Sequence, residues 1–153
     1  MARKNVYLAS ALFSDSERRA NEQIATLLEK WFDVFLPQRD GRLIAELIAE
    51  GMKVDAAYSH VFGKDIEAIH GCDAIMINLD GRTVDEGAAF ELGFAFANGK
   101  VCVGYRTDVR VLLPWGLNPM LTAPLERVFR SDLELESWCA TFAASKSNLS
   151  ATG

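Results

Sequence analysis

Four carboxylates gather in a short stretch near the middle of the 153-residue chain. Asp80, Asp85, Glu86 and Glu91 fall within twelve positions. Glu91 stands out because it lies inside the otherwise apolar segment 88–97, where an ionised carboxylate is costly unless it is paired, hydrogen-bonded or beside a wet cleft. Buried acids with shifted ionisation gather at functional sites. Two carboxyl groups in one pocket suit glycosidic chemistry, in which one attacks the anomeric carbon and the other moves a proton.

Glu91 also has a purely structural interpretation, in which it caps backbone amides or pairs with an arginine. The small residues around it favour a binding site, because Gly87, Ala88 and Gly93 allow a ligand or another backbone to approach closely. The sequence therefore indicates a candidate site near 80–91 and leaves both interpretations of Glu91 open.

The motifs of several other chemistries are absent. No G-x-G-x-x-G follows the first apolar run, where residues 9–13 read ASALF, and neither G-x-x-x-x-G-K-[ST] nor G-x-S-x-G occurs. His60 and His70 have no obvious serine or cysteine partner. These absences argue against dinucleotide binding of the Rossmann kind and against serine or cysteine acyl transfer.

The three cysteines are far apart and form no C-x-x-C pair: Cys72, Cys102 and Cys139. With only two histidines in the chain, a closed zinc site is not expected. We expect three buried thiols in a reducing compartment, and we expect neither a metal nor an organic cofactor.

The composition narrows the class of protein. Half of the residues are apolar, and 16 basic side chains stand against 21 acidic ones for a net charge of −5. An acidic chain lacks the basic footprint of a nucleic-acid polymer binder, and no apolar run approaches the roughly 20 residues that span a bilayer. We expect a cytoplasmic protein that binds neither nucleic-acid polymers nor membranes. We also expect one domain over 1–153, with a frayed tail at 145–153.

Apolar runs alternate with helical patterns along the chain. Strands are expected at 5–9, 33–36, 73–78, 101–104 and 127–129. Helices are expected from Ser14 or Asp15 to Trp31, at 42–50, at 53–70 with a break at Gly63, at 85–98 and at 133–144. A turn is expected at 37–41 and a long irregular connection at 109–124, where Trp115 and Met120 are candidates for a lid or a partner-subunit wall.

This alternation predicts parallel strands joined by right-handed crossovers. Five such strands favour an α/β, flavodoxin-like three-layer sandwich with a five-stranded parallel sheet. Ligands of such sheets lie outside the carboxyl ends of the strands. The segments 9–15, 79–91 and 105 onward are therefore expected to line the site.

Several segments resemble the nucleoside 2-deoxyribosyltransferase family. The resemblance is carried by VYLA at 6–9 with Phe13, by DIEAIHGCDAIMINLD at 65–80, by DEGAAFELGFA at 85–95 and by NPML at 118–121. It covers about residues 5–144, and the block around Glu91 is the most specific part.

The resemblance implies a role for each matching residue. Glu91 matches the nucleophile that forms a covalent 2-deoxyribosyl-enzyme, and Tyr7 matches the hydroxyl that orients it. Asp73 and Asp85 match acids that touch the base or the sugar and help to move the proton. The implied partners are a deoxynucleoside and a free nucleobase.

The resemblance also implies substrate-binding residues. Phe13 is expected to stack near the base, and Gln38 or Asp40 to hydrogen-bond it. Asn118 is expected to reach the sugar 5′-hydroxyl in a neighbouring subunit, which implies a homo-oligomer with shared sites. Gly87 and Met120 complete the expected substrate-binding set.

The sequence leaves several alternatives open. Most assigned residues also fit structural roles, with Tyr7 and Phe13 in the core, Asp73 and Asn118 in turns, and Asp85 as a helix cap. The same site with water as acceptor gives an N-glycosidase of deoxynucleosides or their 5′-monophosphates, and a third possibility is a non-catalytic nucleotide-binding module. Hydroxyls and arginines at 12–19 suit a phosphate, but the acids of that loop oppose one and favour a free nucleoside.

Overall fold

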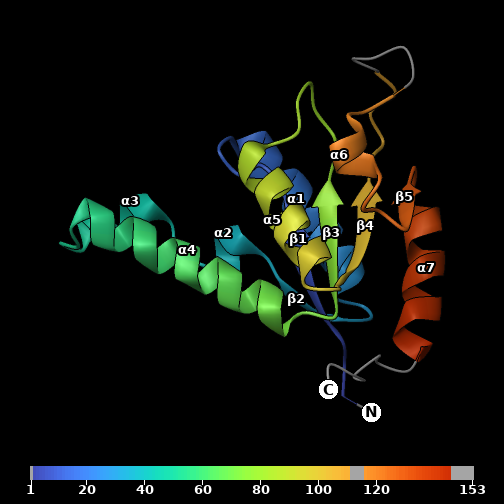
Figure 1. Ribbon diagram of the computed structural model, residues 1–153, viewed down its shortest axis with the longest axis horizontal. Helices are drawn as coiled ribbons and strands as arrows, with labels where there is room; N and C mark the ends of the chain where they lie inside the picture. Colours follow the sequence, from blue (N-terminus) through green and yellow to red (C-terminus); the bar gives the residue numbers. More distant parts are fainter. Residues whose placement is uncertain (1, 111–115, 146–153) are drawn as a thin grey trace.

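The computed structural model describes residues 2–110 and 116–145 of the chain. Its centre is a five-stranded parallel sheet with the strand order β2-β1-β3-β4-β5, shown in Figure 1. The strands are β1 (Asn5–Ala9), β2 (Asp33–Phe35), β3 (Ala74–Asn78), β4 (Val101–Tyr105) and β5 (Arg127–Phe129). The predicted α/β architecture and its five parallel strands are confirmed.

Two helical layers cover the sheet. On one face, α1 (Asp15–Leu28) and α7 (Asp132–Ala144) pack on a core that includes Phe32 and Phe129. On the other face, α5 (Glu86–Ala97) contacts β1, β3 and β4 and packs against α4 (Val54–Gly71). The strands β1, β3 and β4 are buried almost throughout because helices cover both sides, which explains their uninterrupted apolar sequence.

Helix α4 projects away from the sheet, with the short helix α3 (Ile44–Ala49) packed beside its far end (Figure 1). The expected break at Gly63 is wrong, because α4 runs through this residue without interruption. Helix α1 ends at Leu28, earlier than predicted, and the chain turns there so that Phe32 enters the core.

Two short helices replace predicted irregular structure. The expected turn at 37–41 contains α2 (Pro37–Asp40), and the connection at 109–124 contains α6 (Pro119–Thr122). Each begins with a proline, whose fixed φ angle suits the first helical position. Trp115, one of the two expected lid residues, lies outside the described residues.

The predicted burial of the cysteines is confirmed, since Cys72, Cys102 and Cys139 are buried and unbridged. Within the described ranges, no helix is both long and apolar enough to cross a membrane. The same part of the chain holds no cluster of three or more side chains placed to bind a metal ion.

Candidate active site

A pocket of about 420 Å³ opens beyond the carboxyl end of β1. It lies between the loop that follows β1, the α3 region, α4 and the start of α5, and we call it the Glu91 pocket. Its lining residues are Ser10, Leu12, Phe13, Arg18, Pro37, Arg42, Leu43, Ile44, Ala45, Val61, Asp65, Asp85, Gly87 and Glu91. Four sequence-predicted site residues thus meet here: Phe13, Asp85, Gly87 and Glu91.

Glu91 is held by the hydroxyl of Tyr7. The Tyr7 Oη donates a hydrogen bond of 2.8 Å to Glu91 Oε1. Tyr7 is fully buried in the middle of β1, and its ring stacks on Phe35 at a centroid distance of 5.4 Å. The sheet therefore fixes the hydroxyl, and through it one oxygen of the carboxylate.

The pKa of Glu91 is raised to about 8. Burial is the main cause because it penalises the charged form, and the nearby carboxylates of Asp65 and Asp85 add to the increase. The hydrogen bond from Tyr7 acts in the opposite direction and stabilises the charged form. Burial and the nearby Glu91 carboxylate also raise the pKa of Tyr7, so its phenol keeps its proton.

Asp65 is a third carboxylate of the pocket, and no role was predicted for it from the sequence. Burial raises its pKa to about 6, while Lys64 acts to lower it. It stands on α4 four positions after Val61 and four before the buried Ile69. Residues four positions apart lie on the same face of a helix, so Asp65 is an acid on the inward-facing side of α4. This spacing is the sequence signal that could have identified Asp65 as a site residue.

Asp85 both caps α5 and lines the pocket. Its Oδ2 accepts a hydrogen bond of 2.9 Å from the backbone N–H of Ala88. Gly87 lies two positions later, and a Cβ at this position would lie 3.0 Å from Asp85 Oδ2. The glycine therefore leaves the space that the carboxylate and a ligand need.

Phe13 extends into solvent at the rim of the pocket, with 77% of its surface exposed. The backbone before α1 is held by the carboxylate of Glu17, which accepts hydrogen bonds from the N–H groups of Phe13 and Ser14. The exposed ring is therefore carried on an ordered loop, where it offers a flat surface to a ligand.

Asp73 does not lie in the Glu91 pocket. It precedes β3, at the amino end of the sheet, and its Oδ2 accepts a hydrogen bond of 2.8 Å from the backbone N–H of Asn5. The pocket lies at the carboxyl end of β1. The expectation that Asp73 works beside Glu91 is thus corrected, and we assign Asp73 to joining the starts of β1 and β3.

Gln38 and Asp40 also lie outside the lining of the pocket. The Gln38 Oε1 accepts a hydrogen bond of 2.9 Å from Asn21 Nδ2, and its Nε2 donates to the Arg18 carbonyl. Asp40 Oδ2 accepts a hydrogen bond of 2.8 Å from the N–H of Leu36. Their hydrogen bonds hold α2 in place, and the expected contact of either residue with a base stays a prediction.

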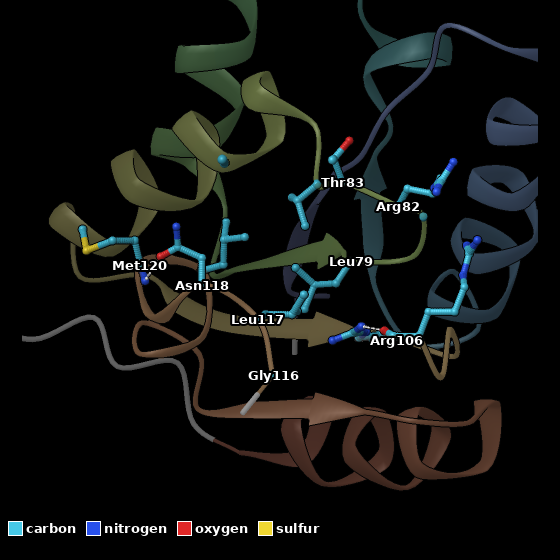
Figure 2. A pocket seen from close by; sticks show the side chains of 13 residues that line it. Leu79, Arg82, Thr83, Arg106, Gly116, Leu117, Asn118 and Met120 are labelled. Atoms are coloured by element: carbon cyan, nitrogen blue, oxygen red, sulfur yellow. Dashed lines mark hydrogen bonds between the residues drawn. The ribbon is translucent and has the colours of Figure 1, made fainter. Parts of the chain in front are cut away.

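Asn118 and Met120 line a second pocket, of about 630 Å³, on the other side of the start of α5 (Figure 2). Asn118 Oδ1 accepts a hydrogen bond of 2.9 Å from the N–H of Met120 and so caps α6. Met120 is 79% exposed. Within one chain, neither residue lines the Glu91 pocket.

The raised pKa of Glu91 predicts an effect on stability. The pKa is about 8 in the folded chain against an ordinary value of 4.5, so proton binding stabilises the fold at low pH and this stabilisation is lost as the pH rises to about 8. Glu91→Gln keeps an acceptor for Tyr7 and removes the charge. We expect the variant to exceed the parent by about 1–3 kcal/mol in free energy of unfolding near pH 8, and to match it near pH 4.

Urea unfolding at both pH values measures this difference. Glu86→Gln on the exposed first turn of the same helix is the matched control, with an expected change within about 0.5 kcal/mol at either pH. A Glu91→Gln effect that stays constant with pH would contradict the assigned burial of the charge.

A family model described as nucleoside 2-deoxyribosyltransferase matches residues 6–149. A 2-deoxyribosyltransferase from Bacillus psychrosaccharolyticus is 22% identical with a TM-score of 0.74, over 95% of this chain and 99% of that one. A 2-deoxyribosyltransferase from Leishmania mexicana is 28% identical with a TM-score of 0.63, over 92% and 97%.

A CMP N-glycosidase from Clostridium botulinum shares the fold at 19% identity and a TM-score of 0.53, over 91% of this chain and 99% of that one. No curated protein matches the chain. The family match spans nearly the whole described structure and contains every residue that lines the Glu91 pocket. The chain therefore belongs to the nucleoside 2-deoxyribosyltransferase family.

Proposed function

We propose that the protein moves 2-deoxyribose between nucleobases by a retaining double displacement, with Glu91 as nucleophile. The observation that carries the proposal is the half-buried Glu91 carboxylate, held at 2.8 Å by the Tyr7 hydroxyl in a pocket with two further carboxylates. A carboxylate that is oriented and poorly hydrated is a strong nucleophile toward an electrophilic carbon.

In the first displacement, an oxygen of Glu91 attacks C1′ of the deoxynucleoside. The bond between C1′ and the base nitrogen breaks, its electron pair leaves with the base, and the base takes a proton from an acid of the pocket. The pKa of Glu91 is about 8, so near neutral pH Glu91 must first give up its proton. Asp65 lies in the same pocket and burial raises its pKa to about 6, so it is suited to take this proton from Glu91 and pass it to the leaving base. The missing 2′-hydroxyl makes the oxocarbenium-like transition state easier to reach.

In the second displacement, a nitrogen of the incoming base attacks C1′ from the side that the first base has left. The ester bond to Glu91 breaks and its electron pair returns to the carboxylate, while the base proton passes to the pocket acid. Two inversions give net retention. Tyr7 stabilises the Glu91 carboxylate both before the attack and after its release, because its hydroxyl donates a hydrogen bond to Glu91 Oε1.

The charges around the pocket favour a nucleoside over its 5′-monophosphate. Arg18 and Arg42 line the pocket, but each is already paired with carboxylates. Arg18 binds Asp15, and Arg42 lies within 2.5 Å of Glu50 and 3.6 Å of Glu46. A phosphate would have to compete with these partners, whereas an uncharged sugar would not.

We further propose that a second copy of the chain completes the site. Helix α4 projects from the sheet (Figure 1) and carries Tyr58 and Phe62, which are 59% and 57% exposed. Phe62 lies 6.1 Å from the half-exposed ring of Phe90 on α5, the helix of Glu91. A contiguous aromatic surface of this kind marks a protein interface, and a second copy here would lie beside the Glu91 pocket.

The transfer proposal predicts a specific product. Incubation with deoxyinosine and adenine is expected to yield deoxyadenosine and hypoxanthine, and Glu91→Gln is expected to lower the rate by at least about 10³-fold because an amide is a poor nucleophile. Chromatography of the nucleosides measures both. Glu86→Gln, on the same helix but outside the pocket, is the control and is expected to keep activity.

Three outcomes would change or contradict the proposal. Free deoxyribose with no deoxyadenosine would make water the acceptor and the protein an N-glycosidase. Binding of deoxynucleosides without any turnover, or unchanged turnover by Glu91→Gln, would contradict the assignment of the nucleophile.

The interface proposal predicts a change of mass in solution. Replacing both Tyr58 and Phe62 by serine removes exposed aromatic surface without disturbing the core, so we expect the oligomer to dissociate toward monomer in size-exclusion chromatography with light scattering. Leu133→Ser, at a 77%-exposed position of α7, is the control and should leave the mass unchanged. A monomeric parent protein would contradict the proposal.

A further inference from the structure

The loop 10–14, which joins β1 to α1, forms one wall of the Glu91 pocket, and three of its residues line that pocket. Side chains from the first two turns of α1 hold its backbone. The Glu17 carboxylate accepts a hydrogen bond of 3.0 Å from the N–H of Phe13. Arg18 Nη1 donates one of 2.8 Å to the carbonyl of Leu12. The helix therefore holds the loop that precedes it.

Asn21 is a third anchor of this loop, and it is the most deeply buried of the three, with 1% of its surface exposed. Its Nδ2 donates hydrogen bonds of 2.8 Å to the carbonyl of Ala11 and of 2.9 Å to Gln38 Oε1. Its Oδ1 has no hydrogen-bond partner among the described residues, so burying this amide costs stability. A buried group that costs stability and yet connects parts of a pocket fits a functional role better than a purely structural one.

Asn21 also connects the loop with α2, where Pro37 lines the same pocket. Gln38 Nε2 donates hydrogen bonds of 3.0 Å to the Arg18 carbonyl and of 3.2 Å to Glu22 Oε1, both on α1. These bonds hold the amide oxygen of Gln38 toward Asn21. A continuous set of hydrogen bonds thus runs from the loop through α1 to α2, and it joins two walls of the Glu91 pocket.

We propose that Asn21 is a positioning residue for base binding: through Ala11 it holds the loop so that the ring of Phe13 is already in place when a nucleobase stacks on it. Phe13 lies two positions after Ala11, and its ring is mostly in solvent, so the loop backbone sets its position. A loop that is ordered before binding loses less freedom when the ligand binds. This inference rests on the proposed function, because a nucleobase is the ligand that Phe13 is expected to contact.

Calorimetric titration with deoxyinosine tests the inference in full-length proteins that all carry Glu91→Gln, so that no ligand is consumed. The set consists of this parent, Asn21→Leu, Phe13→Ala and the combination of the two. Leucine fills the space of the amide without its hydrogen bonds, and we expect it to weaken binding about 3- to 10-fold. In the Phe13→Ala background we expect the same change to alter the affinity by less than about twofold, because the ring through which Asn21 acts is gone.

Kinetics with Glu91 intact separate positioning from chemistry. Asn21→Leu is expected to raise KM for the deoxynucleoside about 3- to 10-fold and to change kcat by less than about threefold, because the hydrogen bond from Tyr7 to Glu91 comes from β1 and not from the loop. Thr26→Val is the matched control. It removes an exposed hydrogen bond of 2.8 Å to the Glu22 carbonyl within α1, outside the pocket, and is expected to leave both constants unchanged.

A second variant keeps the test decisive if Asn21→Leu does not fold. Asn21→Ser adds no bulk to the core, and its side chain is too short to reach the Ala11 carbonyl as the amide does. We expect it to weaken deoxyinosine binding by at least about threefold in the parent and by less than about twofold with Phe13→Ala.

Equal affinities of a folded Asn21 variant and the parent would overturn the inference. An Asn21 effect that persists at full size in the Phe13→Ala background, or a fall in kcat at constant KM, would also overturn it. A protein that binds deoxyinosine with the expected dependence on Asn21 but transfers no deoxyribose would contradict the proposed function alone. A protein that transfers deoxyribose without that dependence would contradict only the role of Asn21.

Discussion

The carboxylate of Glu91 lies on an apolar helix that packs against the sheet, so its charged form loses hydration. The neighbouring side chains of the site determine how much of this loss is offset. Tyr7 can offset part of this loss because β1 is paired on both sides, with β2 and β3, and because Phe35 on β2 stacks on its ring. Asp85 begins the helix that carries Glu91, and Asp65 approaches from α4. Two further acids near a buried carboxylate raise its pKa instead of relieving it, which is the pattern of a proton-handling site and not of a structural ion pair.

The pairing of Glu91 with Tyr7 illustrates what a sequence can predict. The sequence of β1 is one apolar run because both of its faces are covered. The sequence of α5 has a helical pattern in which Glu91 interrupts a series of apolar residues. The family resemblance then connects the two residues, which lie 84 positions apart and form a hydrogen bond in the structure. The five strands could be located in the same way, since buried parallel strands are uninterrupted and turn residues separate them.

The sequence pattern did not predict which of the two acids, Asp73 or Asp65, lies at the Glu91 pocket. Asp73 lies in a matching segment, but it precedes its strand, and in a parallel sheet that places it at the amino end, away from the ligand edge. Asp65 lies eight positions earlier in a helix, where its direction depends on how α4 packs against α5. Gln38 and Asp40 likewise could not be assigned, because α2 turns their side chains into hydrogen bonds that only the fold specifies.

The proposed mechanism depends on a covalent bond between Glu91 and the sugar. The most direct measurement is the mass of the protein after brief exposure to a deoxynucleoside that carries fluorine at C2′, because the fluorine slows release of the intermediate. We expect the mass of one fluorinated deoxyribosyl group to be added, located on Glu91 by peptide mapping and absent from Glu91→Gln. An unchanged mass in a protein that still turns over deoxynucleosides, or a sugar on another residue, would contradict the account.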